Sequence, residues 1–408
     1  MKQQEAAGTE SAEQPPSNWR AFYVAWAGQL TSSLGGPFQT IALGIWALES
    51  GHGPTGLSWI LAAGTLSQLA GALLGGPLVD RFGALRTVAV SDLVRFLLAV
   101  VLGCLVWGSA PLHWIILVTA VTGCISGAFL PALRALAPAF LTESDLPRGN
   151  SFFELAKNAS MLGGSLLGGI TLTLTGPVAA IAINAASFAI GGIGAALAAR
   201  SAHSSPQPAA EPMLTSLAAG IRYTLTARWL LILIGIDAVM DFVTAGQLSV
   251  GLPAITQELG GGAALGVLFA SFGGGSVIGA WLAPRVRPGR LGPARAVLVL
   301  HLLQAPLLAA LPVSPLPVGA ACLVVMGVLN GIAVVIYMSI IQRTAPSAML
   351  GRVMSLLVFA GLSLQPLGQL STGWSIEAGW LAASFVIAAS IMAVTSAVAL
   401  TSKTLRDL

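Results

Sequence analysis

The segment Leu97–Val106 reads LLAVVLGCLV, and the segment Ile387–Leu400 reads IAASIMAVTSAVAL. Neither contains a charged residue, and neither alternates apolar and polar positions as the strands of a membrane barrel do. In lipid, backbone N–H and C=O groups have no water to bond, so continuously apolar runs require the internal hydrogen bonds of an α-helix. These two runs therefore predict helices that cross a membrane.

The whole chain has the same character. Of its 408 residues, 55% are hydrophobic and only 8% are charged, whereas soluble domains carry about 25% charged residues. Apolar stretches recur at the length of about 20 residues that crosses a hydrocarbon layer of about 30 Å. The net charge is only +4, and the basic residues are scattered singly. The composition therefore excludes secreted, cytosolic and nucleic-acid-binding classes.

Polar residues, prolines and glycines divide the chain into twelve predicted membrane-spanning helices. They lie at about 20–47, 57–79, 88–108, 112–134, 150–174, 177–198, 229–251, 262–284, 294–312, 316–341, 353–374 and 379–400. The segment Ser201–Met213 is rich in Ser, Pro and Ala, which is typical of a flexible linker. The predicted fold class is an all-α membrane protein with twelve transmembrane helices in two six-helix bundles.

This division predicts five segments. They are a disordered cytoplasmic tail at 1–18, an N-terminal six-helix bundle at 19–200, a cytoplasmic linker at 201–228, a C-terminal six-helix bundle at 229–401 and a cytoplasmic tail at 402–408. None of the 19 Lys and Arg residues falls in the predicted outer loops. Because basic residues are retained on the cytoplasmic side, both termini are expected in the cytoplasm, with the chain in the cell's inner (plasma) membrane.

The two halves are related by an internal repeat at an offset of 204 residues, without a gap. The offset aligns Gly71 with Gly275, Gly75 with Gly279, Gly123 with Gly327, Gly127 with Gly331, and Arg81 with Arg285. Since each half has an even number of predicted spans, the halves have the same orientation and are related by an axis along the membrane normal.

The loop between the second and third spans, Gly75–Arg86, reads GGPLVDRFGALR. At a helix end, Asp80 beside Arg81 can bridge to a neighbouring helix. The stretch resembles the inner-loop signature of the major facilitator superfamily, G-x-x-x-D-R/K-x-G-R-R/K, at Gly76, Asp80, Arg81, Gly83 and, more loosely, Arg86. Ala84 and Leu85 stand where that family usually has basic residues. The resemblance implies a conformational latch, and a static determinant of topology is the alternative.

Other stretches resemble the exporter branch of this superfamily, which includes enterobactin-type and macrolide efflux permeases. They are Ser91–Arg95, Leu146–Asn150, Leu350–Val353 and Gln365–Gly368. In the fifth span, Gly164, Ser165, Gly168 and Gly169 resemble the end of the antiporter signature G-P-x-x-G-G, with Ser165 in place of the proline. The resemblance implies a segment that seals a leak path, and simple close helix packing is the alternative.

Charged residues inside predicted spans are the strongest functional signal. Asp237 and Asp241 lie one turn apart on one face of the seventh span. An ionised carboxylate at the midplane costs roughly 2.5–3.5 kcal/mol on insertion scales, and two neighbours repel each other, so at least one is expected to bind a proton. The pair predicts a proton-coupling site or a contact for a cationic substrate, and a structural hydrogen bond is the alternative.

Two further charged pairs have helical spacing. Glu154 and Lys157 in the fifth span either neutralise each other at the inner mouth or take part in coupling. Asp92 and Arg95 in the third span are expected to brace neighbouring helices. Polar residues of other spans are candidates for a central cavity: Gln29, Gln39, Asn158, His301, Gln304, Asn330 and Tyr337.

These features predict a secondary active transporter that exports a small amphipathic molecule, such as a drug, antibiotic, siderophore or other secondary metabolite. Proton antiport and rocking of the two bundles are the expected mechanism, in a monomer whose partners are substrate, protons and the lipid bilayer. A nutrient importer of the same fold and a non-transporting membrane receptor or assembly partner are the alternatives. No phosphate-binding loop, metal-ligand cluster or paired nucleophile and base is present in the sequence, so neither an enzyme nor a cofactor or metal site is expected.

Overall fold

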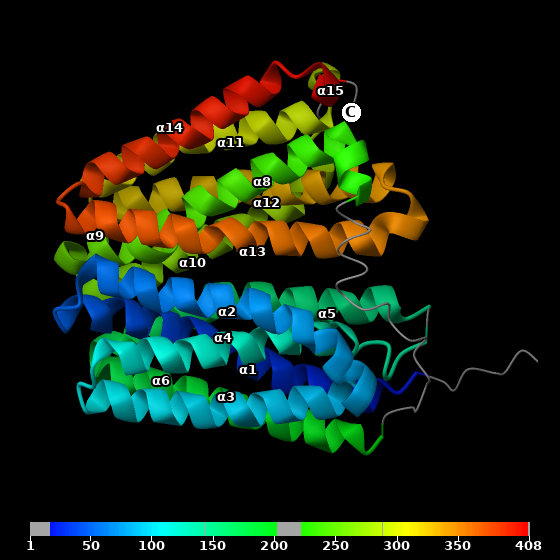
Figure 1. Ribbon diagram of the computed structural model, residues 1–408, viewed down its shortest axis with the longest axis vertical. Coiled ribbons are helices and arrows are strands. Elements are labelled where there is room, and N and C mark those ends of the chain that lie inside the picture. Colours follow the sequence, from blue (N-terminus) through cyan, green and yellow to red (C-terminus); the bar gives the residue numbers. More distant parts are fainter. Residues whose placement is uncertain (1–16, 143, 202–221, 288, 407–408) are drawn as a thin grey trace, which may run out of the picture.

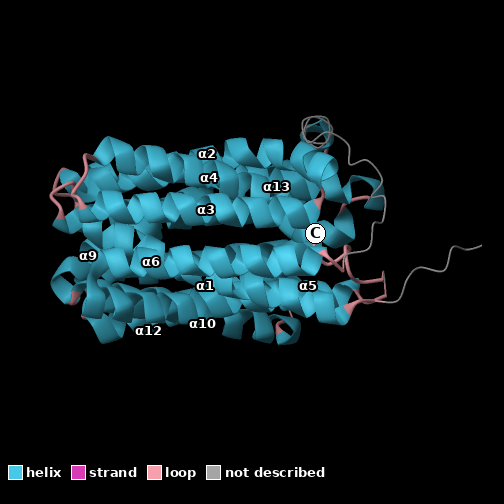
Figure 2. Ribbon diagram, turned by 90° about the horizontal axis from the view of Figure 1, so that it is seen from below, coloured by secondary structure: helices cyan, strands magenta, loops and turns pink. Residues whose placement is uncertain are grey.

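The computed structural model describes residues 17–142, 144–201, 222–287 and 289–406, and all regular structure in these ranges is helical (Figures 1 and 2). The long helices are α1 (Trp19–Glu49), α2 (Gly53–Phe82), α3 (Ala84–Trp107), α4 (Leu112–Arg134), α5 (Leu146–Ala159), α6 (Ser165–Ala199), α8 (Arg228–Gly246), α10 (Gly261–Leu282), α11 (Pro293–Ala310), α12 (Leu316–Thr344), α13 (Ser347–Glu377) and α14 (Leu381–Leu400). Shorter elements are the π-helices η1 (Ser160–Gly164) and η2 (Gln247–Gly251), and the helices α9 (Leu252–Leu259) and α15 (Lys403–Arg406). The predictions for residues 1–16, 202–221 and 407–408 lie outside the described residues.

Ten helical stretches among the described residues are long and apolar enough to cross a membrane, which confirms the prediction of a multi-pass helical membrane protein. Two differences separate this number from twelve. The 31-residue helix α1 is not among the ten, and the predicted spans at 150–174 and 177–198 fall within one stretch, Arg148–Ala199. That stretch is interrupted at Gly176, whose φ of 82° and ψ of 176° are not helical. The count of twelve stays a prediction.

The helices run side by side in one elongated block, with their connections at its two ends (Figure 2). In Figure 1, α1–α6 lie together below and α8–α15 lie together above, and we call these groups the N-terminal and C-terminal halves. The start of α1 and the helix α15 lie at the same end of the block, here called the tail end. The opposite end, where α9 lies, is called the far end.

Glycines of the 204-residue repeat bring helices into backbone contact in both halves. A Cβ atom on Gly71 of α2 would clash with the backbone oxygen of Cys124 in α4, and a Cβ on Gly275 of α10 would clash with that of Val324 in α12. The repeat is thus visible as a shared mode of packing. The repeat offset of 204 residues would pair Gly275 with residue 328, the equivalent of Cys124, but Gly275 meets Val324 instead. The contact between α10 and α12 is therefore shifted by four residues, about one helical turn, relative to the contact between α2 and α4.

A buried ion pair ties together the N-terminal half. The guanidinium of Arg95 lies 2.5 Å from Asp92 Oδ1, and the two side chains are 8% and 0% exposed. Gln29 of α1 donates a hydrogen bond of 2.9 Å to Asp92 Oδ2. The guanidinium also lies 3.9 Å from the ring centre of Phe129 in α4 and 4.7 Å from that of Phe188 in α6. The expectation that this pair braces neighbouring helices is confirmed.

The two halves contact each other near the far end through α2 and α13. Thr55 Oγ1 donates to the backbone oxygen of Gly373 at 3.5 Å, and the Thr55 backbone N–H donates to Glu377 Oε2 at 3.5 Å. Deeper in the block, Gln369 Nε2 donates to Thr65 Oγ1 at 3.4 Å. Ser58, between these contacts, is fully buried. These polar contacts hold the two halves together at the far end.

A second contact between the halves involves α6 and α10. Gly169 and Gly266 face each other so closely that a Cβ atom on either would lie 2.8 Å from the Cα of the other. Because real Cβ atoms do not approach other carbons so closely, any larger residue at either position forces the helices apart. Glycine is therefore what allows the backbones of the two halves to meet here.

Candidate functional site

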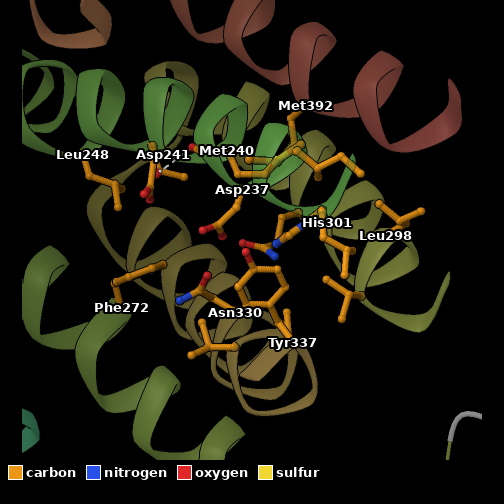
Figure 3. A pocket seen from close by; sticks show the side chains of 17 residues that line it. Asp237, Met240, Asp241, Leu248, Phe272, Leu298, His301, Asn330, Tyr337 and Met392 are labelled. Carbon is orange, nitrogen blue, oxygen red and sulfur yellow. Dashed lines mark hydrogen bonds between the residues drawn. The ribbon is translucent and has the colours of Figure 1, made fainter. Parts of the chain in front are cut away.

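A cavity of about 270 Å³ lies inside the C-terminal half (Figure 3). Its lining comes from α8, η2, α10, α11, α12 and α14 and is mainly apolar, with Met240, Phe272 and Met392 among the larger side chains. Methionine side chains are flexible and adapt to ligands of different shape. The polar residues of the lining are Asp237, Asp241, Thr244, His301, Gln304, Asn330 and Tyr337.

Six residues that were predicted from the sequence as candidate site residues line this one cavity: Asp237, Asp241, His301, Gln304, Asn330 and Tyr337. Both carboxylates belong to α8. They point into the same cavity because positions four apart lie on the same face of a helix. No Lys or Arg is found in the described lining, and neither carboxylate forms an ion pair with another described residue. The pair is therefore an uncompensated acidic site within a membrane helix, which is costly unless a proton or another cation neutralises it.

Two polar atoms of the cavity lack hydrogen-bond partners among the described residues. The Tyr337 hydroxyl and His301 Nδ1 are both buried and unpaired. Figure 3 shows the side chains of Asp237, Asn330, Tyr337 and His301 directed toward one another. The Tyr337 hydroxyl faces the Asp237 carboxylate, although the two groups do not form a hydrogen bond of ordinary geometry. Buried polar atoms are almost always satisfied, so this arrangement is suited to water or to a polar group of a ligand.

Asp241 also faces α13, the helix that contacts the N-terminal half. A Cβ atom on Gly361 would lie 2.6 Å from Asp241 Oδ2. One turn further along α13, the side-chain amide of Gln365 lies beside the same carboxylate. Asp241 therefore lies between the cavity and the surface of α13.

Other predicted cavity residues lie elsewhere. Gln29 is buried against Asp92 in the N-terminal half, and Gln39 accepts a hydrogen bond of 2.6 Å from Asn184 Nδ2 of α6. Asn158 is half-buried and Lys157 is exposed, both on α5. The side chain of Glu154 lies outside the described residues. Gln29, Gln39, Lys157 and Asn158 are not part of the described lining of the cavity in the C-terminal half.

The antiporter-like segment lies where α1, α6 and α10 meet. It begins at the π-helix η1, and Ser160 in that turn donates a hydrogen bond to the backbone oxygen of Ser33 in α1. A Cβ on Gly164 would lie 2.7 Å from the Leu34 backbone oxygen, and one on Gly168 would lie 3.1 Å from the Phe38 Cα. Ser165 is buried at the start of α6, and Gly169 faces α10. The four residues of the predicted signature thus form close helix contacts.

The predicted latch lies at the tail end, between α2 and α3. Gly76 is within α2, and Gly83 has a φ of 80° and a ψ of 154°, a conformation that strongly favours glycine. The guanidinium groups of Arg81 and Arg86 lie 5.2 Å and 6.0 Å from the centre of the Phe82 ring. Asp80 is exposed and forms no ion pair with the residues described. Among the described residues, Asp80 therefore has no ion-pair partner on a neighbouring helix in this arrangement.

Three site residues were not predicted as such: Thr244, Gly361 and Gln365. Thr244 follows Asp237 by seven residues, so helical periodicity places it on the acidic face and could have found it. Gly361 carries no side chain, and its role depends on how α13 packs against α8. The sequence holds no local signal for that contact.

Comparisons with known proteins agree with this architecture. The family model described as Major Facilitator Superfamily matches residues 25–368. The multidrug efflux pump Tap of Mycobacterium tuberculosis H37Rv is 28% identical over 341 residues, covering 80% of each chain, and Tap of Mycolicibacterium fortuitum is 25% identical over 361 residues, covering 84% of this chain and 86% of the relative. The puromycin resistance protein pur8 of Streptomyces alboniger is 35% identical over 138 residues, which is 34% of this chain and 26% of that protein.

Solved structures share the fold at low sequence identity. A bacterial homologue of the iron transporter ferroportin in an inward-facing state has a TM-score of 0.71 at 14% identity, covering 95% of this chain and all of the other. A POT family transporter in complex with a thioalcohol-conjugated peptide has a TM-score of 0.75 at 13% identity, covering 93% and 95%. Since the family model spans most of the chain, the chain belongs to the Major Facilitator Superfamily and is a membrane transporter rather than an enzyme.

Proposed function

We propose that the chain is a proton-coupled exporter of small amphipathic compounds, with Asp237 and Asp241 as the proton-binding groups. The observation that carries the proposal is the cavity of the C-terminal half, where two carboxylates and two unpaired polar atoms share a described lining that holds no Lys or Arg. Relatives named as a multidrug efflux pump and a puromycin resistance protein support drug efflux as the physiological direction.

The proposed topology has twelve crossings in two six-helix bundles, with the tail end in the cytoplasm. The ten apolar stretches become twelve when α1 is added and Arg148–Ala199 is divided at Gly176. With this orientation the contacts between the halves lie on the outer side, so the arrangement described above is inward-facing. Rocking of the two halves against each other gives alternating access, with the carboxylate site carried by the C-terminal half. Impermeant thiol reagents should label cysteines at Gly51 and Pro315 from outside and spare one at Gly83; the reverse would overturn this orientation.

In this mechanism protons and the substrate bind alternately to the two carboxylates. Deprotonation toward the cytoplasm leaves a negatively charged cavity, which a substrate with a cationic or hydrogen-bond-donating group stabilises. Protons that arrive from the outer side neutralise the carboxylates again after the substrate has left. The protein changes between the inward-facing and outward-facing arrangements at low cost only when protons or substrate balance the charge of the carboxylates. This restriction couples the flux of protons to the flux of substrate.

Transport in proteoliposomes tests the proposal. Proteoliposomes that contain the purified protein should accumulate a cationic dye, such as ethidium, against its concentration gradient. The driving force is a proton gradient directed out of the vesicles, so that protons leave as the dye enters. Asp241→Asn should abolish this uphill accumulation while preserving exchange of dye across the membrane. If the carboxylates serve only to bind cationic substrates, the same variant should lose affinity for the dye yet still pump neutral compounds.

A further inference from the structure

The helix α13 connects two features that the proposed function treats separately. Near its middle, Gly361 and Gln365 face the Asp241 carboxylate. Two turns after Gly361, at about 1.5 Å per residue, Gln369 donates a hydrogen bond to Thr65 of the N-terminal half. The far-end contacts of Gly373 and Glu377 with α2 follow on the same helix. The residues of α13 that face Asp241 and those that contact the N-terminal half therefore belong to one continuous helix.

The contact at Gly361 differs from the backbone-to-backbone glycine contacts of the fold. It is of the same kind as that of Gly53, where the nearest atoms that a Cβ would meet belong to the carboxylate of Glu377. A Cβ on Gly368 of the same helix would clash with the backbone of Phe242, as expected for helix packing. A Cβ on Gly361 would meet only Oδ2 at 2.6 Å and Cγ at 3.9 Å of Asp241 among the described atoms outside its own helix. Space at Gly361 is therefore filled by one ionisable group and by no backbone atom.

We propose that Gly361 and Gln365 form a socket on α13 for the Asp241 carboxylate, and that the charge of the group in this socket sets how firmly α13 holds the far-end contact with α2. A neutral group fits against the bare backbone at Gly361 and leaves α13 seated on α8. An ionised carboxylate there lacks a cationic partner and favours a shift of α13 that admits water or substrate. Gly361 and Gln365 are positioning residues, because they act through Asp241.

Few titratable groups lie near the socket, so an effect of charge in the socket can be assigned to Asp241. The titratable groups that face Asp241 are Asp237 of the same helix, Tyr337 of α12 and His301 of α11. The helices α10 and α14 contain no Asp, Glu, Lys, Arg or His, and the same is true of η2. On α13, Gln365 faces Asp241 as a neutral amide.

Ser58 supplies a reporter for the far-end contact. It is fully buried, and its hydroxyl lies against Gly373 of α13. In a chain whose Cys104, Cys124 and Cys322 are replaced by alanine, Ser58→Cys should react with an impermeant thiol reagent only when α2 and α13 separate. Asp241→Asn mimics the neutral group and should slow this labelling about tenfold, a typical effect for directly coupled residues.

The decisive variant is Gly361→Ala. Its new Cβ displaces the Asp241 carboxylate from the socket and lies near no backbone atom of another helix. In the Gly361→Ala background, Asp241→Asn should change the labelling rate by less than about twofold, because contacting residues behave non-additively. The matched control is Gly235→Ala on α8, where a Cβ has nothing within 4 Å and where the full effect of Asp241→Asn should persist. Should Gly361→Ala fail to fold, Gln365→Leu serves as the second variant, with the same expected loss of the Asp241→Asn effect.

The inference rests on the proposed function, yet it can fail separately from it. An undiminished Asp241→Asn effect in Gly361→Ala or Gln365→Leu would overturn the socket while leaving proton coupling intact. The absence of any Asp241→Asn effect on labelling in the unmodified socket would also overturn it. Loss of the proposed function would instead appear as drug transport that ignores the proton gradient, a measurement that does not involve Ser58.

Discussion

Gly169 of the N-terminal half and Gly266 of the C-terminal half pack backbone against backbone, each leaving no room for a Cβ on the other. Gly169 is also the last residue of the antiporter-like segment, so this segment takes part in closing the block at the far end. Under the proposed orientation, the glycine pair is one of the seals on the outer side of the inward-facing arrangement.

Gly169→Ala should therefore open the far end. The new Cβ would lie 2.6 Å from the backbone oxygen of Gly262, so the helices must separate. We expect labelling of Ser58→Cys to rise about tenfold, corresponding to roughly 1.4 kcal/mol lost from the closed arrangement. Gly36→Ala is the control, because nothing lies within 4 Å of a Cβ at that position. Equal labelling in the two variants would show that the glycine pair does not seal the block.

The buried ion pair predicts a distinct effect on stability. Asp92→Ala leaves the Arg95 guanidinium buried without its carboxylate and should lower the free energy of unfolding by about 3–5 kcal/mol. The double variant Asp92→Leu with Arg95→Leu removes both charges and should recover most of this loss. Thermal unfolding of the purified variants in detergent measures both effects. A double variant no more stable than Asp92→Ala would mean that the hydrogen bonds from Gln29 and Ser32 matter more than the charge balance.

Tyr337→Phe separates function from stability in the cavity. The Tyr337 hydroxyl is buried without a partner among the described residues, so its removal should leave the free energy of unfolding unchanged or raise it by about 1 kcal/mol. If the hydroxyl holds water against Asp237, the same variant should lower uphill transport several-fold. Thermal unfolding and gradient-driven transport are measured on one preparation. A large loss of stability would instead identify Tyr337 as a packing residue of the core.

Asp80→Asn tests the proposed latch at the tail end. Asp80 is exposed and unbridged in the arrangement described here, so a latch role requires that it bind in the opposite, outward-facing arrangement. The variant should insert normally, transport more slowly and label less at Ser58→Cys, because the outward-facing state loses a stabilising contact. Lys403→Gln at the same end serves as the control. Unchanged transport would reduce the loop to a determinant of topology.

The sequence predicts some parts of the site better than others. The acidic pair of α8 is predictable because its spacing and its depth in an apolar span are local properties. The positions of Gln29 and Gln39 could not be predicted, since a polar residue in a span indicates only that its side chain avoids lipid. Its partner depends on how α1 packs against α3 and α6.

The contact of Gly361 with Asp241 could not be predicted from the sequence. It is one of 48 glycines, and only the packing of α13 against Asp241 distinguishes it from those that join helices. The fold itself was more accessible, because apolar length and the distribution of basic residues act along the whole chain. The repeat likewise predicts paired glycine contacts, although the one-turn displacement of α10 and α12 depends on tertiary packing.

Substrate-driven proton movement in proteoliposomes is the most direct test of whether Asp237 and Asp241 couple export to protons. A pH-sensitive dye inside the vesicles reports whether export of an amphipathic cation releases protons in the opposite direction. We expect proton movement that depends on substrate in the wild-type protein and is lost in the Asp237→Asn, Asp241→Asn double variant, with passive substrate exchange retained. Proton movement and substrate affinity that are both unchanged in the double variant would show that the two carboxylates are structural groups and not a coupling site.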